Sequence, residues 1–140
     1  MNTGRESAMA PPFLEQALQV APFHRWLGVT VVAQGGESVS IEMPWRDEMI
    51  SSPKLPAMHG GIVAALIDLT GFYTVLASGN ICASTADLHV DYHRAASRET
   101  IVAHGKIVRV GKRLSVAEVK VEGQRGLIAS GRGAYTMKAE

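Results

Sequence analysis

The chain has 140 residues, the length of one ordinary domain, and a chain of this length buries roughly two-thirds of its unfolded surface around a single core. Its formal net charge of +1 gives no bulk signal for binding nucleic acid. Its one cysteine, Cys82, excludes an internal disulfide and a zinc site built from cysteines, and fits a reducing cytoplasm. We therefore expect one cytoplasmic domain over residues 1–140, in which residues 1–10 lack the apolar core of a signal peptide and form a flexible N-terminus.

The first half of the chain predicts a short helix, a hairpin and a loop. An amphipathic pattern over 13–20 follows two prolines and predicts the helix. Residues 27–34 and 37–45 predict two strands joined by a glycine pair, and the second strand alternates apolar and polar side chains, which indicates one buried face. Residues 46–58 hold two prolines and two serines and predict a loop.

A long apolar stretch over 58–79 predicts a central helix. It approaches the length of about 20 residues that a membrane span needs, but it contains His59, Asp68, two threonines and four glycines, so we expect a buried helix and no membrane. Because this helix is apolar nearly all round, it must be covered on most sides. One small sheet covers only part of it, and we expect a second copy of the chain to cover the rest in a homo-oligomer.

The second half predicts four strands in hairpin succession, over 84–92, 100–110, 114–123 and 127–137. In the first of these strands the even-numbered residues form one face and the odd-numbered residues, including Thr85, form the other, which indicates a half-buried strand. Strands that are segregated from one helix predict an α+β fold. The obvious arrangement is an antiparallel sheet that curls around the central helix.

The central helix begins with two adjacent glycines, Gly60 and Gly61. The first N–H groups of a helix have no intrahelical partner and carry a partial positive charge, and glycine lets a substrate carbonyl approach them. The pair could therefore bind a developing oxyanion. A tight entry from loop to helix explains the same two glycines without any chemistry.

Asp68 is the one acid in the central helix, between Ile67 and Leu69. An aspartate is rarely buried without a partner, and a desolvated carboxylate is a candidate general base. The alternative is a structural aspartate that pairs with an arginine or caps a neighbouring element.

The spacing of the glycines and Asp68 constrains how they could cooperate. Gly61 and Asp68 are seven residues apart, so they share a helix face but stand roughly 10 Å apart along the axis. Both cannot touch one carbonyl carbon from the same helix. If both act on one substrate, the glycines come from one copy of the chain and Asp68 from another, across a two-fold axis.

The stretch from His59 to Asp68, together with Gly71, resembles the HGG…L-x-D…G signature of hotdog-fold thioesterases of the phenylacetate-degradation (PaaI-like) type. The segment at 84–96, STADLHVDYHRAA, is similar to this family's T-x-D-L-x-V-x-Y-x-R-P-A strand, with Ala96 in place of the proline. The resemblance covers residues 23–137. It implies the hotdog fold, a homodimer or dimer of dimers, an active site at the subunit interface, and hydrolysis of acyl- or aryl-acyl-CoA.

The resemblance also implies roles for the residues that match the signature. Asp68 is the general base or the nucleophile against the thioester. The Gly60 amide polarises the thioester carbonyl, with Gly61 beside it, and His59 orients this loop or contacts the carbonyl region. A hydroxyl on the next strand, from Thr85 or Ser84, positions the attacking water.

A second set of residues matches segments that contact coenzyme A in this family: Tyr92, Arg109, Val110, Gly111, Lys112, Arg113 and Leu114. The cations among them could receive the phosphates of coenzyme A. An ordinary charged sheet edge that discourages strand pairing is the alternative.

The sequence departs from the family at one position. Many relatives have an asparagine or glutamine six or seven residues before the histidine, where this chain has Ser52 and Pro53. Ser52 can donate one hydrogen bond but cannot replace an amide. A binding protein that holds an acyl-CoA without hydrolysing it is therefore a competing hypothesis.

Other chemistries find less support in the sequence. The histidines His24, His89, His93 and His104 lack metal-ligand spacing, and no G-x-S-x-G motif indicates a serine hydrolase. We find no pairing of a histidine and an acid that would indicate a hydratase of the same fold. We expect no metal and no cofactor, because coenzyme A is part of the substrate.

Overall fold

The computed structural model describes residues 13–138, so the expected flexible segment 1–10 lies outside the described residues. Two short helices come first, followed by two strands, a 3-10 turn and a small hairpin, then a long helix and four strands. In chain order these are α2 (Phe13–Leu18), α3 (Pro22–Leu27), β1 (Thr30–Gln34), β2 (Ser38–Met43), η1 (Asp47–Met49), β3 (Ile50–Ser52), β4 (Leu55–Met58), α4 (Gly60–Ala77), β5 (Cys82–Tyr92), β6 (Ile101–Arg109), β7 (Leu114–Gly123) and β8 (Gly126–Met137).

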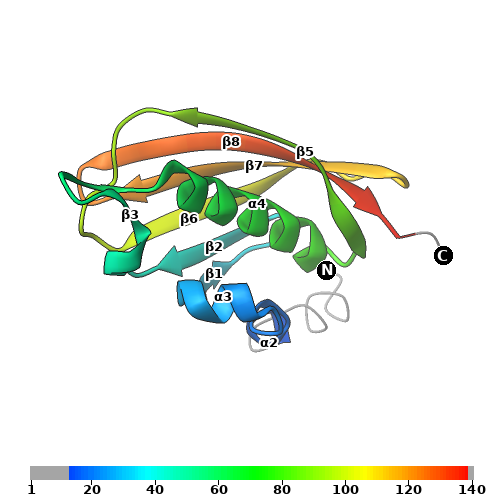
Figure 1. Cartoon of the computed structure of the whole chain (residues 1–140). Helices are drawn as coiled ribbons and strands as arrows, with labels where there is room; N and C mark the ends of the chain where they lie inside the picture. Colours follow the sequence, from blue (N-terminus) through cyan, green and yellow to red (C-terminus); the bar gives the residue numbers. More distant parts are fainter. Residues whose placement is uncertain (1–12, 139–140) are drawn as a thin grey trace.

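Six of the strands form one antiparallel sheet in the order β1-β2-β6-β7-β8-β5, which curls around α4 (Figure 1). The expected α+β fold with a central helix is confirmed. The expected hairpin succession of the last four strands is wrong in one respect, because β5 pairs with β8 at the sheet edge and not with β6. Residues 93–100 carry the chain across instead, and they are anchored where the Ala96 carbonyl accepts a hydrogen bond from the Met58 amide at 2.8 Å.

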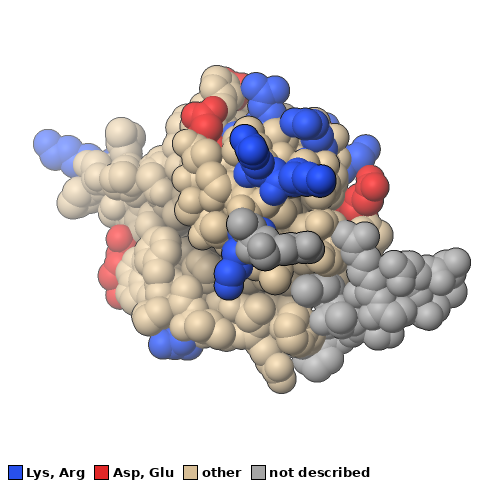
Figure 2. Space-filling view, turned by 90° about the vertical axis from the view of Figure 1, so that its right-hand side faces the viewer, with Lys and Arg blue, Asp and Glu red and all other residues tan. Residues whose placement is uncertain are grey.

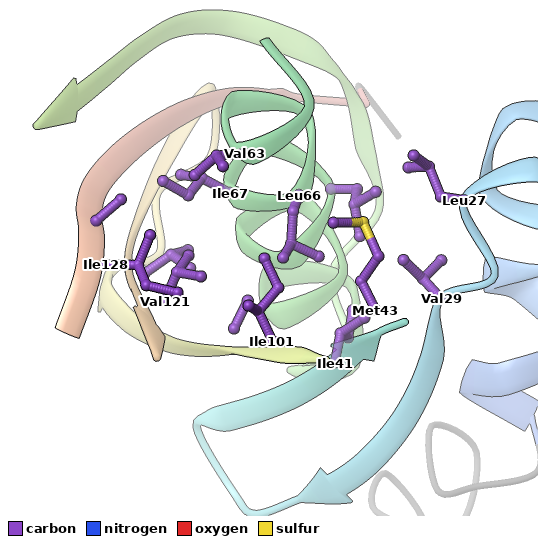
Figure 3. Packing of buried hydrophobic residues seen from close by; sticks show 14 of the residues in the cluster. Leu27, Val29, Ile41, Met43, Val63, Leu66, Ile67, Ile101, Val121 and Ile128 are labelled. Atoms are coloured by element: carbon purple, nitrogen blue, oxygen red, sulfur yellow. The ribbon is translucent and has the colours of Figure 1, made fainter. Parts of the chain in front are cut away.

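The core lies between the concave face of the sheet and one side of α4 (Figure 3). Leu66 and Ile67 on the helix are fully buried, as are Ile41, Ile101 and Val121 on three different strands. Burying a side chain of this size contributes about 1.5–3 kcal/mol, so this contact area dominates the stability of the fold. α4 is long and apolar enough to cross a membrane, with a mean hydropathy of 1.6, but half of that stretch is buried inside the protein.

Helix α3 is absent from the sequence-based expectation, and it shortens the first predicted strand, which begins at Thr30 and not at residue 27. Pro22 opens this helix and Gly28 closes it, with a positive φ of 75° that suits glycine. Leu27 and Val29, on either side of this cap, are fully buried. Leu27 therefore belongs to a helix. Its burial and the geometry of the glycine cap outweigh the strand-like pattern of the residues that follow it.

The expected loop over 46–58 is also more regular than predicted. It contains η1 and the hairpin of β3 and β4, which pairs Ile50 with Met58 and Ser52 with Leu55. Its backbone joins the start of the central helix, because the His59 amide donates to the Met49 carbonyl at 2.7 Å. Pro53 sits in the turn of this hairpin, where a proline interrupts no ladder hydrogen bond.

Candidate active site

His59 caps the start of α4 and fixes the geometry of the two glycines. Its ring Nδ1 accepts a hydrogen bond from the Gly61 amide at 2.8 Å, so the Gly61 amide is engaged within the chain. The Gly60 amide has no acceptor among the described residues. Of the two predicted oxyanion donors, the structure therefore leaves Gly60 open and assigns Gly61 to the helix cap.

Tyr92, from the end of β5, holds the same glycine turn from the other side. Its hydroxyl donates to the Gly60 carbonyl at 2.6 Å, and its side chain is half exposed. Tyr92 and Gly60 share a hollow of about 260 Å³ with Arg94, a residue that the sequence-based site did not include. The predicted substrate contact Tyr92 thus also positions the backbone at the helix start.

Asp68 lies in the middle of α4 and is joined to β5 by a hydrogen bond. The Thr85 hydroxyl donates to Asp68 Oδ1 at 2.7 Å. Asp68 is only partly buried, so a single chain does not provide the complete desolvation expected from its apolar neighbours. Oδ2 has no hydrogen-bond partner among the described residues, which leaves one carboxylate oxygen available to a substrate or water.

Thr85 points toward α4 because β5 contains a bulge. The strand pairs Thr85 with Tyr135 and Asp87 with Ala134, so Ala86 is an extra residue without a partner. The bulge places Thr85 on the helix side of the sheet together with Leu88 and Val90, which pack against the core. The expectation that Thr85 lies on the opposite face from these residues is therefore wrong, since it assumed an uninterrupted alternation.

Ser84, the alternative water-positioning hydroxyl, is turned the other way. Its Oγ lies 2.8 Å from Oγ1 of Thr136 on β8, and its amide donates to the same hydroxyl. The geometry therefore favours Thr85 over Ser84 as the partner of Asp68. Ser52 is likewise engaged locally, because its Oγ accepts a hydrogen bond from the Lys54 amide at 3.3 Å within the turn of its hairpin.

Asp68 and Thr85 open into a hollow of about 210 Å³, whose other lining residues are His24, Leu69, Phe72 and Tyr73. Three of these are rings, and their centroids lie 5.6 Å apart for Phe72 and Tyr73 and 5.7 Å apart for His24 and Tyr73. A carboxylate at the mouth of an apolar pocket can place a reacting group beside it and an apolar group inside. His24 was not predicted for this site because it comes from the unexpected helix α3.

The backbone of Asp68 is fixed by Tyr135 on β8, the cross-strand partner of Thr85. The Tyr135 hydroxyl donates to the Asp68 carbonyl oxygen at 3.1 Å. Burial, and then the nearby charges of Asp68 and Cys82, raise the pKa of Tyr135, so this hydroxyl keeps its proton. Gly71 and Gly133 make room for it, since a Cβ at either position would come within about 2.1 Å of the hydroxyl oxygen. A glycine in mid-helix, Gly71, is the only signal for this contact in the sequence.

The predicted coenzyme A residues from Arg109 to Leu114 form the tip of the β6–β7 hairpin. Arg109, Lys112 and Arg113 are exposed, and Figure 2 shows Lys and Arg side chains gathered on this side of the molecule. The Gly111 amide donates to Ser115 Oγ at 3.1 Å and tightens the turn. Three cations on one exposed turn give it a local positive charge that the overall charge of the chain does not reveal.

Within one chain this turn and the glycines lie at opposite ends of α4 (Figure 1). The Arg113 carbonyl accepts from the Met137 amide and the Lys138 amide donates to the Ile81 carbonyl, so the turn lies beside the segment that leaves the C-terminal end of the helix. An 18-residue helix spans about 27 Å, and Gly60 and Asp68 are separated by roughly 12 Å along it. The structure therefore does not bring the predicted site residues together in a single chain.

Residues 13–138 contain no group of three or more His, Cys, Asp or Glu side chains that could hold a metal ion. The hollows at Asp68 and Gly60 are lined by hydrogen-bonding and acid–base groups. They are suited to polarising a carbonyl and moving a proton.

Comparisons with known proteins agree on one family. The model described as "Thioesterase superfamily" matches residues 55–129, more than half of the chain. A solved structure described as a protein from the thioesterase superfamily is 38% identical, with a TM-score of 0.84 over 89% of this chain and 96% of its own. The Escherichia coli PaaI protein from the phenylacetic acid degradation operon shares the fold, with a TM-score of 0.83 at 16% identity over 99% of this chain and 97% of its own. The Escherichia coli medium/long-chain acyl-CoA thioesterase YigI is 25% identical over 86% of this chain and 94% of its own length.

Proposed function

Because the chain belongs to the thioesterase superfamily, as a PaaI-like protein with the hotdog fold, we propose that it hydrolyses the thioester bond of an acyl-CoA. The products are a free acid and coenzyme A. The name of the YigI relative supports acyl-CoA as the substrate class. The observation that carries the proposal is the Asp68 carboxylate, held by Thr85 at the mouth of an apolar hollow with its second oxygen open.

In the proposed reaction Asp68 acts as the general base. The oxygen of a water molecule attacks the thioester carbonyl carbon, and one water proton passes to Asp68. The carbonyl electron pair moves to oxygen, which becomes an oxyanion, and then returns as the carbon–sulfur bond breaks and coenzyme A leaves as a thiolate. Thr85 holds Oδ1 and so directs Oδ2 toward the water.

The Gly60 amide is the proposed donor to the oxyanion. It is open among the described residues and lies at the start of an 18-residue helix, where the partial positive charge of the helix adds to the hydrogen bond. His59 and Tyr92 hold the turn in place through Gly61 and the Gly60 carbonyl. Removing a donor of this kind typically reduces the rate about 100- to 1,000-fold.

The distance of roughly 12 Å between Gly60 and Asp68 along one helix leads us to propose that the two groups act from different copies. An antiparallel pair of α4 helices, related by a two-fold axis, would bring Gly60 of one copy to Asp68 of the other and produce two sites per dimer. The side of α4 that carries Asp68 and Phe72 is only partly buried, which leaves it available for such a contact. We further propose that Arg109, Lys112 and Arg113 receive the phosphates of coenzyme A.

The test is thiol release from a panel of acyl-CoA thioesters, aliphatic and aromatic, with wild-type protein and Asp68→Asn side by side. We expect release by wild type and a loss of about 100- to 10,000-fold in kcat for the variant, the usual contribution of a general base. The control is the melting temperature, which should change little because Asp68 lies outside the buried core. Equal rates for both proteins would disprove the role of Asp68.

A non-hydrolytic acyl-CoA-binding protein is the second candidate, and Ser52 favours it. The hydroxyl at the position of the family's amide accepts a hydrogen bond from its own hairpin, and the one hydrogen it has left to donate does not replace the two of an amide. Saturable binding of acyl-CoA by calorimetry, with no thiol release from any panel member, would select this function over hydrolysis.

A further inference from the structure

We propose that His24 is the second residue that holds the attacking water, through its Nε2 atom. This inference rests on the proposed hydrolysis by Asp68 and adds a residue from helix α3 to that site. His24 lines the same hollow as Asp68 and Thr85, although it lies 44 positions earlier in the chain than Asp68.

The tautomer of His24 follows from its hydrogen bond. Its Nδ1 lies 2.8 Å from the carbonyl oxygen of Leu18, which can only accept, so Nδ1 carries the hydrogen. In the neutral ring Nε2 then carries a lone pair and accepts hydrogen bonds. Nε2 has no hydrogen-bond partner among the described residues, and the side chain is only partly buried.

The ring is held in place by groups that do not use Nε2. It stands edge-to-face against Tyr73 of α4, with centroids 5.7 Å apart and an angle of 77° between the planes. Tyr73 in turn donates its hydroxyl to the Ala17 carbonyl at 3.1 Å. These contacts join α2 and α3 to the central helix and fix His24 in the hollow that Asp68 also lines.

A water molecule in this hollow would donate one hydrogen bond to Asp68 Oδ2 and one to His24 Nε2, and both bonds are needed to orient it for attack. Its two O–H groups can donate to two atoms, and a lone pair on its oxygen then points away from both of them. Asp68 Oδ2 accepts the hydrogen that is transferred during attack, and His24 Nε2 accepts the one that remains on the carboxylic acid product. Holding both hydrogens directs the attacking lone pair, which is how positioning lowers a barrier.

Three variants distinguish the roles of the two nitrogens of His24. His24→Asn keeps a donor near the position of Nδ1 and can retain the contact with Leu18, but it has nothing at the position of Nε2. His24→Gln reaches the position of Nε2 with an amide oxygen and gives up the Leu18 contact. His24→Phe keeps the ring against Tyr73 and loses both nitrogens.

The measurement is steady-state thiol release, with kcat and KM determined separately on the best acyl-CoA of the panel. We expect His24→Phe and His24→Asn to lower kcat about tenfold with little change in KM, as the loss of one hydrogen bond predicts, and His24→Gln to recover most of kcat. The reverse order, with Asn active and Gln inactive, would show that His24 only anchors α3 and would overturn the proposal. A change confined to KM would overturn it as well, since it would place His24 against the acyl group.

Two controls keep the result interpretable. His89→Asn removes an exposed histidine that contacts Asp91 and lines neither hollow, so it leaves both His24 nitrogens in place, and we expect it to keep kcat within about twofold of wild type. Asp68→Asn tests the proposed function itself. If wild type hydrolyses acyl-CoA, Asp68→Asn does not, and all His24 variants match wild type, only the proposed role of His24 is disproved. If wild type releases no thiol, both proposals are disproved.

Discussion

The two sides of α4 differ in how far the rest of the chain buries them. One side carries Leu66 and Ile67, which are fully buried in the core. A second side carries Asp68 and Phe72, which are only partly buried and line a hollow beside β5 and β8. Core residues and the candidate catalytic carboxylate are thus neighbours on one helix, so substitutions one or two residues apart should have effects of different kinds.

The largest effect expected from the buried side is a loss of stability. Leu66→Ala should lower the free energy of unfolding by about 2–5 kcal/mol, because the residue is fully enclosed and the cavity cannot collapse against a rigid sheet. Urea denaturation followed by circular dichroism measures this value. The comparison is Asp68→Asn, two residues away, and a similar loss of stability in both variants would break the division between the two sides of the helix.

The contact between Gly71 and Tyr135 should give the next largest effect. Gly71→Ala places a Cβ about 2.1 Å from the Tyr135 hydroxyl, and we expect overpacking to destabilise the protein by about 1–3 kcal/mol despite the better helix propensity of alanine. In a Tyr135→Phe background the hydroxyl is gone, so the same substitution should be tolerated better. A double-mutant cycle measures the coupling, and additive effects would show that the two residues do not collide.

On the open side we expect a smaller effect, on rate and not on stability. Thr85→Val keeps the shape of the side chain but removes the hydrogen bond to Asp68 Oδ1, and it should lower kcat about tenfold, the equivalent of one hydrogen bond. Ser84→Ala is the matched control on the opposite face of β5, and it should leave kcat unchanged. If the Ser84 variant proves the slower of the two, the bulge does not determine which hydroxyl serves the site.

The smallest expected effect is a dependence of stability on alkaline pH. Burial raises the pKa of Cys82 from 9.0 to about 11, so the folded chain holds this proton more tightly than the unfolded chain does. The stability that this group contributes is complete below pH 9 and is lost as the pH rises toward 11. Thermal unfolding between pH 8 and 11 tests this, with Cys82→Ala as the comparison, which should show a shallower decline if the thiol is responsible.

Features that depend on hydropathy and on residues close together in the chain could be predicted from the sequence. The apolar stretch that became α4, its opening glycines and Asp68 were all identified, because burial and a three-residue motif leave clear local patterns. His24 could not be placed from the sequence, since its position depends on a six-residue helix whose contacts with α4 are distant in sequence. Pro22 and Gly28, which open and close that helix, were the available signal.

The face on which a strand residue lies also could not be predicted from the sequence where it depends on pairing across the sheet. The alternation rule assigned Thr85 to the outer face, and only the pairing of β5 with β8 shows that Ala86 is unpaired and that the phase changes there. Tyr135 was missed for a related reason, because a buried tyrosine on the last strand looks like ordinary core until its hydroxyl is seen to reach the helix.

The unpaired Ala86 has a consequence for how such a site can arise. An extra residue in an edge strand rotates only the part of the strand on one side of it, so Leu88 and Val90 keep their places in the core while the segment before the bulge exchanges its faces. One extra residue at this point therefore brings an inward-facing hydroxyl next to Asp68 without any change in the core residues that follow it. The strand gains a functional group because its side chains exchange faces before the bulge, while the packing after the bulge stays the same.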